Sequence, residues 1–359
     1  FMSYLDIQEF LGFFDFIDFV ISREGEIGIV EFAKNFLKKT FDNVPGLYSR
    51  QMGKILFNNE KFIENLDCLP FPDFSDFKLE RYLLPFPVLP VIFSRGCFWK
   101  RCTFCTYYKH YPVSYKTKSI KKFIAEIRYY NSKGIRHFFI DDDVISALDL
   151  NAISTALNKN KIKIFFGAIV RPERDFSCKV LKNIYSAGGR VLIWGVESSC
   201  QRILDLMNKG TRIKYIKSIL KSSNENGFHN HLFMIQGFPT QTEAEIHKDI
   251  KFLQEKRDFI HSFYIHRFYL APGSYIFYNL KKFKINSIKA LPLYTCIKNK
   301  TTVHSNNFAF ESDIKLDWKR IEGKETKMFK RFKNAFIKKY IAYEHSHLLL
   351  HARQVGIKA

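Results

Sequence analysis

The sequence has no apolar run that reaches the roughly 18 residues required to span a membrane. Its first residues are acidic and aromatic, whereas a secretory signal peptide is basic and then apolar. Cysteine is sparse and odd in number, with 7 in 359 residues, which excludes a regular disulfide framework. We therefore expect a globular, cytoplasmic protein with no membrane span, in a reducing compartment.

Acidic residues are scarce relative to basic ones, with 35 Asp and Glu against 57 Lys and Arg and a net charge of +22. A basic surface can indicate a nucleic-acid partner. Lys, Phe, Ile and Asn are all abundant, however, and their codons are rich in A and T, so genome composition accounts for the excess equally well. We keep nucleic acid as a less favoured partner.

Three of the seven cysteines lie within nine residues, as Cys97, Cys102 and Cys105. They follow Gly96 and the apolar run 88–93, which is predicted to be a buried strand. Three thiolates at this spacing suit an iron–sulfur cluster and leave one iron of a cubane without a protein ligand. An open metal position is typical of chemistry rather than of a structural site. The other four cysteines are scattered and are interpreted as buried apolar thiols: Cys68, Cys178, Cys200 and Cys296.

A structural zinc site is the main alternative for this loop. The pair Cys102 and Cys105 has the spacing of a zinc half-site, and His110 is near enough in sequence to be a fourth ligand. No second close pair of cysteines exists in the chain. The third interpretation is that these cysteines bind no metal.

Strands and helices alternate through the middle of the chain. We predict strands at 88–94, 136–141, 162–170, 189–195, 229–236 and 260–270, with helices between them such as 119–132 and 242–255. This order predicts an α/β fold with a parallel sheet and right-handed crossovers. Six units are too few for a closed eight-stranded barrel, so an open, partial (β/α)6 barrel is expected. In such folds the site lies at the carboxyl ends of the strands, where the cysteine loop also falls.

Three regions are therefore expected: 1–85, a core at 86–280, and 281–359. The first reads as helix, strand and helix up to about residue 40, followed by a linker with little regular structure. The last is basic and is predicted to be mainly helical. An aromatic stripe there has helical spacing and is interpreted as a packed helix face: Phe329, Phe332, Phe336 and Tyr340.

The cysteine segment resembles the radical S-adenosylmethionine (SAM) superfamily. Ser94-Arg95-Gly96-Cys97 followed by Cys102-Thr103-Phe104-Cys105 is similar to the subset that carries a cobalamin-binding domain in front, although four residues separate the first two cysteines where three are usual. The segments 18–26, 44–48 and 66–73 resemble the end of that Rossmann-like domain and its linker. The resemblance covers about residues 10–280 and implies that most of the cobalamin domain is missing from this chain.

This resemblance implies a partial barrel of radical SAM type and an enzyme. Cys97, Cys102 and Cys105 would hold a [4Fe–4S] cluster whose open iron chelates SAM. One electron, from a donor such as flavodoxin or ferredoxin, would then cleave SAM to a 5′-deoxyadenosyl radical. The substrate would be a peptide or a small metabolite, and transfer of a methyl group to carbon is the best single expectation, with cobalamin bound in the intact protein. A transfer-RNA methylthiotransferase-like enzyme and a nucleic-acid-binding protein with a structural metal are the alternatives.

The resemblance also assigns cofactor contacts. It places Phe104 beside the adenine. Asp141 or Asp142 would accept the methionine ammonium in place of the family's Gly-Gly-Glu turn, or else cap a helix. Arg171 would bind the cofactor carboxylate, with a surface ion pair as the alternative.

Turns after the later strands match family patterns as well. Glu197, in Gly195-Val196-Glu197-Ser198, is expected to contact the ribose or methionine part of the cofactor. Gly237, in the turn 237–239, and the turn 271–274 are expected to bring backbone close to it. Lys209-Gly210 matches a family pattern and is interpreted as a helix end.

Overall fold

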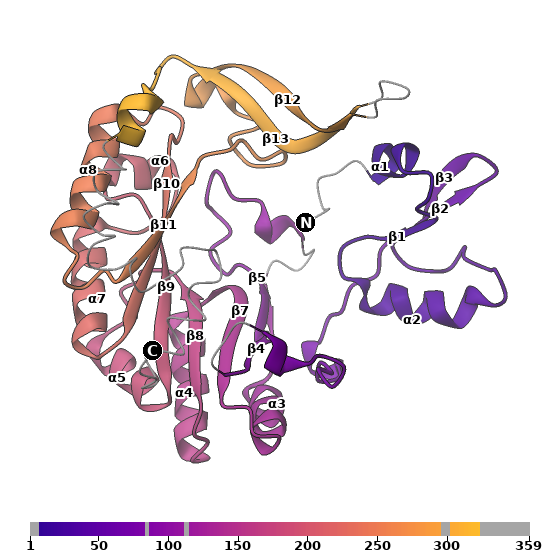
Figure 1. The fold of residues 1–359 in the computed structure, drawn as a ribbon, viewed down its shortest axis with the longest axis horizontal. Helices are drawn as coiled ribbons and strands as arrows, with labels where there is room; N and C mark the ends of the chain where they lie inside the picture. Colours follow the sequence, from indigo (N-terminus) through magenta and orange to yellow (C-terminus); the bar gives the residue numbers. More distant parts are fainter. Residues whose placement is uncertain (1–6, 83–85, 111–114, 296–301, 324–359) are drawn as a thin grey trace. The chain divides into compact units, whose positions relative to one another are not determined.

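The computed structural model describes residues 7–82, 86–110, 115–295 and 302–323 (Figure 1). Two compact units divide the chain. Unit 1 comprises Phe1–Leu66, Phe104–Lys116 and Tyr269–Asp313, and unit 2 comprises Asp67–Thr103, Thr117–Phe268 and Ile314–Ala359. None of the described helices is long and apolar enough to cross a membrane.

Unit 2 is built on a six-stranded sheet in the order β11-β10-β9-β8-β7-β4, in which all neighbours are parallel. The strands are β4 (Val88–Val91), β7 (His137–Ile145), β8 (Phe165–Val170), β9 (Gly189–Glu197), β10 (His229–Gln236) and β11 (Ser262–Arg267). Each strand pairs with the one before it in the chain, which is the order that successive right-handed βαβ units produce. The predicted open, partial barrel is confirmed, with strand boundaries that differ by a few residues.

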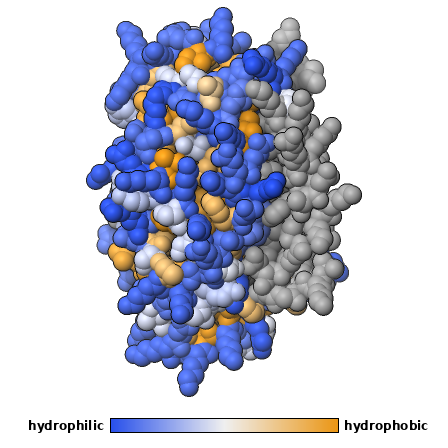
Figure 2. Space-filling view, turned by 90° about the vertical axis from the view of Figure 1, so that its left-hand side faces the viewer, coloured by the Kyte–Doolittle hydropathy of each residue, from blue (hydrophilic) through white to orange (hydrophobic). Residues whose placement is uncertain are grey.

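Helices connect the strands and pack on one face of the sheet (Figure 1). They are α3 (Ile120–Ser132), α4 (Ala147–Lys159), α5 (Cys178–Ser186), α6 (Gln201–Leu206), α7 (Ile213–Glu225) and α8 (Glu243–Glu255). Four of them begin after a side chain whose oxygen accepts a backbone N–H bond, a preferred helix start: Ser119, Ser146, Ser177 and Thr242. The side of the molecule on which α7 and α8 lie is largely hydrophilic toward solvent (Figure 2).

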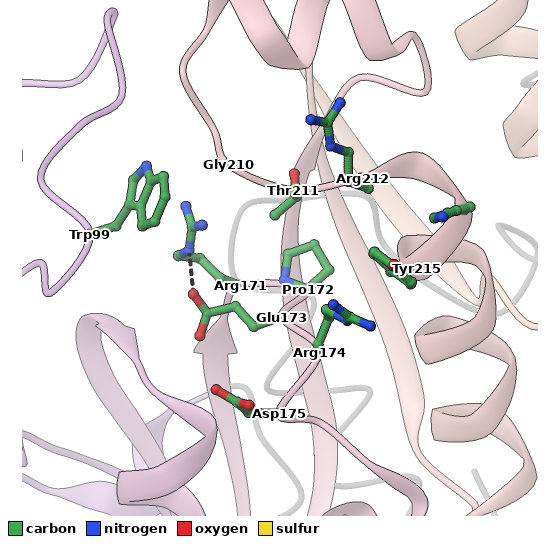
Figure 3. Close-up of a pocket in the computed structure, with 11 residues that line it drawn as sticks. Trp99, Arg171, Pro172, Glu173, Arg174, Asp175, Gly210, Thr211, Arg212 and Tyr215 are labelled. Atoms are coloured by element: carbon green, nitrogen blue, oxygen red, sulfur yellow. Dashed lines mark hydrogen bonds and ion pairs between the residues drawn. The ribbon is translucent and has the colours of Figure 1, made fainter.

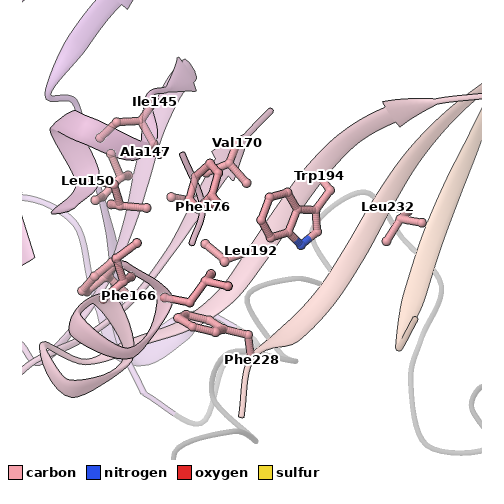
Figure 4. Packing of buried hydrophobic residues seen from close by; sticks show 14 of the residues in the cluster. Ile145, Ala147, Leu150, Phe166, Val170, Phe176, Leu192, Trp194, Phe228 and Leu232 are labelled. Carbon is pink, nitrogen blue, oxygen red and sulfur yellow. The ribbon is translucent and has the colours of Figure 1, made fainter. Parts of the chain in front are cut away.

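Alternation along the central strands divides the apolar residues between the two faces. On β9, Leu192 and Trp194 join the main core beneath the helices, where they lie with Phe166 and Phe228 (Figure 4). Val191 and Ile193 point to the opposite face and form a smaller cluster with Phe139. The parallel sheet is therefore apolar on both faces, as a sheet of this type requires.

Unit 1 contains a second, antiparallel sheet. Along the chain come α1 (Ile7–Phe13), β1 (Phe19–Ile21), α2 (Gly25–Phe36), β2 (Leu47–Gln51) and β3 (Lys54–Phe57), with strand order β1-β2-β3. The predicted helix, strand and helix are present. The following segment was expected to lack regular structure, and it forms the β2–β3 hairpin instead, because Met52 and Gly53 both adopt the positive φ angles that a tight hairpin turn requires.

Strands also occupy part of the region that we predicted to be mainly helical. After β11 the chain forms β12 (Ile285–Thr295) and β13 (Thr302–Ser312), which pair antiparallel. Phe308 and Phe310 alternate with smaller or polar residues, a period-two pattern that favours a strand, so the expectation of helix is corrected here. A helical turn follows at 318–323. The predicted aromatic stripe at 329–340 lies outside the described residues.

Candidate functional site

The cysteine loop is anchored at the end of α6. Cys97 directly follows the short strand β5 (Ser94–Gly96). A second short strand, β6 (Tyr115–Thr117), follows the cysteine loop along the chain. Thr103 donates its N–H to the Met207 carbonyl at 2.9 Å and its hydroxyl to the Leu206 carbonyl at 3.0 Å. The Trp99 indole N–H donates to the Asn208 carbonyl at 2.8 Å. The last carbonyls of a helix lack partners within the helix, so these donors both complete α6 and hold the loop.

Cys102 lies among charged side chains within unit 2. Burial raises the pKa of its thiol, while the positive charges of Lys209 and Arg171 act in the opposite direction. Glu197 and Cys97 are near enough to contribute to the same pKa. Two predicted cysteines, the predicted arginine and the predicted glutamate are thus brought together at one edge of the sheet.

Lys209 and Glu197 form a buried ion pair, with 2.7 Å between Nζ and Oε1. Burial disfavours the charge of Lys209, but Glu197 and then Cys102 outweigh that cost, so the pKa of Lys209 is raised. Glu197 has a φ of +66°, in the left-handed region that non-glycine residues rarely adopt. Such a conformation costs on the order of 1–3 kcal/mol and tends to occur at functional sites.

Arg171 follows β8 and is only 4% exposed. Its Nε bonds the Glu173 carboxylate at 3.0 Å, its Nη2 donates to the Lys209 carbonyl at 2.7 Å, and its guanidinium stacks 4.3 Å from the Trp99 ring centroid (Figure 3). Its Nη1 is buried and has no hydrogen-bond partner among the described residues. The alternative of a surface ion pair does not fit, because this side chain is buried.

The aspartates Asp141, Asp142 and Asp143 lie within β7, which extends to Ile145 and so beyond the predicted strand end at 141, and they differ in their surroundings. Asp142 is buried and accepts bonds from the backbone N–H groups of Phe93 and Ser94, at 2.8 and 2.9 Å, and from the Ser94 hydroxyl at 2.6 Å. Asp143 accepts a backbone bond from Gly96. Both carboxylates therefore fix the segment that leads into Cys97. Asp141 is exposed, which makes it the better placed of the two predicted ammonium acceptors.

Asp142 provides a test of this arrangement through pH. Burial raises its pKa to about 7, above the unfolded value of about 3.9, so the folded protein holds an extra proton between these values. Its contribution to stability is therefore present below about pH 4 and is lost as the pH rises to about 7. Urea titrations give the free energy of unfolding of the wild type and of Asp142→Asn at each pH. We expect the wild-type value minus the variant value to fall by on the order of 3 kcal/mol between pH 4 and pH 7.5.

The control for this measurement is Asp205→Asn, which removes a carboxylate that is 56% exposed. Its profile should run parallel to that of the wild type. Parallel profiles for Asp142→Asn as well would contradict the assignment of a proton to buried Asp142.

A second buried aspartate joins two of the turns that match family patterns. Asp249, on α8, accepts hydrogen bonds from the N–H and hydroxyl of Ser199 at 2.5 and 2.6 Å and from the Ser198 hydroxyl at 3.1 Å. It also accepts a bond from Gln241 Nε2 at 3.0 Å, and Gln241 Oε1 accepts the Gly237 N–H at 2.8 Å. One carboxylate thereby links the turn after β9 to the turn after β10.

Gly237 also has a packing role. Its φ is +75°, and a Cβ added there would lie 2.8 Å from the Trp318 ring. Its predicted approach to a cofactor stays a prediction. His229 and His231, on β10, both share a hydrogen bond with the Ser262 hydroxyl, at 2.9 and 2.7 Å, and so help to join β10 to β11.

The remaining predicted residues, Phe104 and Cys105, belong to unit 1. There, burial and to a lesser degree Cys105 raise the pKa of Tyr269. Within the described residues, no three Cys, His, Asp or Glu side chains already converge as a metal-binding group, so the ligand set stays a prediction.

The interpretation of the scattered cysteines as buried thiols holds only in part. Cys200 is buried, but Cys68 and Cys178 are exposed, so the interpretation is wrong for these two; Cys296 lies outside the described residues. Cys68 lies in a short 3₁₀ helix, and Cys178 is the first residue of α5, so neither sits in the interior of a strand or long helix.

Sequence reasoning missed the role of several residues. The segment Lys209-Gly210 does close α6, since the Lys209 N–H donates to the Leu204 carbonyl at 3.0 Å, but the ion pair of the Lys209 side chain with Glu197 was not predicted. Trp99 and Asp249 drew no assignment at all. Their positions could have indicated these roles. Trp99 lies inside the cysteine segment, and Asp249 contacts Ser198 of the Gly-Val-Glu-Ser turn.

These features define a class of protein. Residues 91–253 match the model of the Radical SAM superfamily. Residues 91–253 therefore form a radical SAM domain, which includes the cysteine loop and most of the parallel sheet.

Individual proteins with similar sequences or structures are named as methyltransferases or as cobalamin-dependent enzymes. The chain is 28% identical over 249 residues to an uncharacterised methyltransferase from Pyrococcus horikoshii, a match that covers 67% of this chain and 53% of the relative. The structure resembles that of the cobalamin-dependent SAM radical enzyme OxsB with aqua-cobalamin bound, with a TM-score of 0.68, 17% identity, and coverage of 91% of this chain and 53% of OxsB. It also resembles the radical SAM methyltransferase TsrM from Kitasatospora setae, with a TM-score of 0.67, 12% identity, and coverage of 92% and 70%. The chain spans about half the length of the first two.

Proposed function

We propose that this chain is the catalytic part of a cobalamin-linked radical SAM methyltransferase. Cys97, Cys102 and Cys105 would ligate a [4Fe–4S] cluster, and SAM would bind at the carboxyl edge of the sheet. The observation that carries this proposal is the position of Cys102, which lies beside Cys97, Lys209, Arg171 and Glu197.

The residues present fit an anionic cluster. Thiolate ligands bring negative charge into a partly buried site, and such charge requires compensation. Lys209 and Arg171 supply two buried positive charges near Cys102. Nη1 of Arg171 is also buried and has no hydrogen-bond partner among the described residues. When bound, the cluster would supply the electron that cleaves SAM reductively.

The chain's own residues would bind and orient SAM. The exposed carboxylate of Asp141 suits the ammonium of the methionine part, since charge-assisted hydrogen bonds are among the stronger ones. Glu197 lies near Cys102 in a fixed, left-handed conformation, because Lys209 holds its carboxylate and Asp249 holds the two serines that follow it. Phe104, next to Cys105, would lie against the adenine.

Methyl transfer is the reaction that the relatives favour. One is named a methyltransferase over 249 matched residues, and TsrM, a radical SAM methyltransferase, shares the fold. OxsB is described as cobalamin-dependent, and we propose that the complete protein also uses cobalamin. The substrate would be a peptide or a small metabolite that accepts the methyl group on carbon.

Anaerobic reconstitution tests this proposal. The chain is incubated with iron, sulfide and dithionite, and then with SAM and hydroxocobalamin. About four irons and four sulfides should bind per chain, as for one cubane cluster. We expect 5′-deoxyadenosine from reductive cleavage and, with a methyl acceptor present, S-adenosylhomocysteine. Bound zinc without sulfide would contradict the proposal, and salt-sensitive nucleic-acid binding without cleavage of SAM would favour the alternative class.

A further inference from the structure

A pocket of about 740 Å³ lies behind the cysteine loop, entirely within unit 2 (Figure 3). Trp99 of the loop, the segment after β8 and the connection from α6 to α7 form its walls. The described residues that line it include Arg171, Pro172, Arg174, Thr211, Arg212 and Tyr215. Two of its lining residues have roles described above: Arg171 is the expected ligand of the cofactor carboxylate, and Trp99 anchors the cysteine loop. The other side chains of the lining have no assigned role.

The lining is cationic. It contains four positive side chains, Arg171, Arg174, Arg212 and Lys214, and two carboxylates, those of Glu173 and Asp175, which leaves a net charge of +2. Aromatic rings hold three of the cations in place: Arg171 lies 4.3 Å from Trp99, and Arg174 and Lys214 lie 4.4 and 4.9 Å from Tyr215. Such contacts orient cations without neutralising them.

Two buried polar atoms of the lining residues lack partners within the described part of the chain. They are Nη1 of Arg171 and Oγ1 of Thr211, whose residues are 4% and 5% exposed. A buried polar group without a hydrogen bond costs roughly 1–3 kcal/mol, more when it is charged. An oxyanion in the pocket would recover that cost, because it accepts bonds from both a guanidinium and a hydroxyl.

The start of α7 adds to the positive potential. This helix begins at Ile213, whose N–H donates to the Gln201 side-chain oxygen at 3.0 Å, and the Arg212 side chain makes no cap. The helix dipole still places a partial positive charge beside Thr211 and Arg212. Arg212 has one exposed carboxylate nearby, Asp205 at 3.6 Å, which leaves most of its guanidinium available.

We propose that this pocket binds a phosphorylated small molecule, with the phosphate held by Arg171, Thr211 and Arg212. A phosphate monoester carries close to two negative charges at neutral pH, which matches the net charge of the lining, and it offers three terminal oxygens to the three donors. The volume leaves room for the group that carries the phosphate. This proposal does not depend on the radical chemistry proposed above.

Calorimetric titration of the chain tests it with two probes, ribose 5-phosphate and inorganic phosphate. We expect saturable binding of the ester, tighter than that of inorganic phosphate. Thr211→Val keeps the shape of the side chain but removes the hydroxyl, and Arg212→Gln removes an exposed charge with little risk to folding. Each should weaken binding of the ester by roughly 10-fold, the value of one hydrogen bond to a charged group.

Lys217→Gln is the matched control, because Lys217 is an exposed cation on the same helix that does not line the pocket. It should bind the ester as the wild type does. The proposal is overturned if neither probe binds, if the ester and inorganic phosphate bind equally, or if Lys217→Gln weakens binding as much as Arg212→Gln. Competition by SAM would overturn it as well, since the oxyanion held there would then be the cofactor's carboxylate.

Discussion

Replacing Cys102 with alanine is expected to reduce cluster incorporation, formation of 5′-deoxyadenosine and formation of S-adenosylhomocysteine to background. The positive charges of Lys209 and Arg171 act to lower the pKa of Cys102, which shows that this cysteine lies near both cations. Its loss would leave two thiols, too few to hold a cubane with one open iron. Iron and sulfide analysis after reconstitution, together with chromatography of the two products, measures the effect.

Cys178→Ala is the control for this experiment, because Cys178 is an exposed free cysteine at the start of α5. It should retain the iron, the sulfide and both products. Far-ultraviolet circular dichroism should show both variants folded. A Cys102→Ala variant that still bound four irons and cleaved SAM would remove the proposed ligand set.

Replacing Lys209 with methionine is expected to destabilise the fold by roughly 3–5 kcal/mol, the typical cost of leaving one partner of a buried ion pair unpaired. Glu197 would keep its charge in a site where it is only 8% exposed, beside the Cys102 thiol. Urea unfolding measures this change. The same variant should bind SAM more weakly, because Lys209 no longer fixes the Glu197 carboxylate.

Two further variants separate charge burial from loss of packing. The double variant Lys209→Met with Glu197→Gln removes both charges and should be more stable than Lys209→Met alone. Lys221→Met breaks an exposed pair with Glu225, with 3.7 Å between Nζ and Oε1, and should cost no more than about 0.5 kcal/mol. Equal losses for Lys209→Met and the double variant would show that packing, and not the unpaired carboxylate, sets the cost.

The core of the fold was accessible from the sequence because its signals are local. Most strands of the parallel sheet contain a short apolar run, and four of the helices that follow begin after a capping Ser or Thr. The alternation of these two patterns predicted the parallel sheet. The pair β12–β13 was missed because Asn286, Lys289 and Pro292 obscure its alternation in 285–292. The hairpin β2–β3 was missed because its turn, at Met52 and Gly53, lacks the usual Asn-Gly or Asp-Gly signal.

The roles of the site residues stay predictions, but for two residues at strand ends the structure shows that they lie near Cys102. Arg171 and Glu197 follow or end β8 and β9, and the structure brings both near Cys102. Asp142 lies inside β7, because the strand extends to Ile145, and its carboxylate accepts bonds from the backbone N–H groups of Phe93 and Ser94. Which way a side chain turns depends on a neighbour 48 residues away in sequence, and periodicity carries no information about that neighbour.

The bonds to Asp249 have a mechanical consequence for entry of a ligand. Ser199 and Gly237 follow different strands, yet both are tied to the same carboxylate, the second through Gln241. Neither turn can shift alone without breaking a bond to a buried group, at a cost of roughly 1–3 kcal/mol. A ligand that displaces one turn must therefore displace the other as well. The two turns move as one unit, because both are tied to Asp249 on α8.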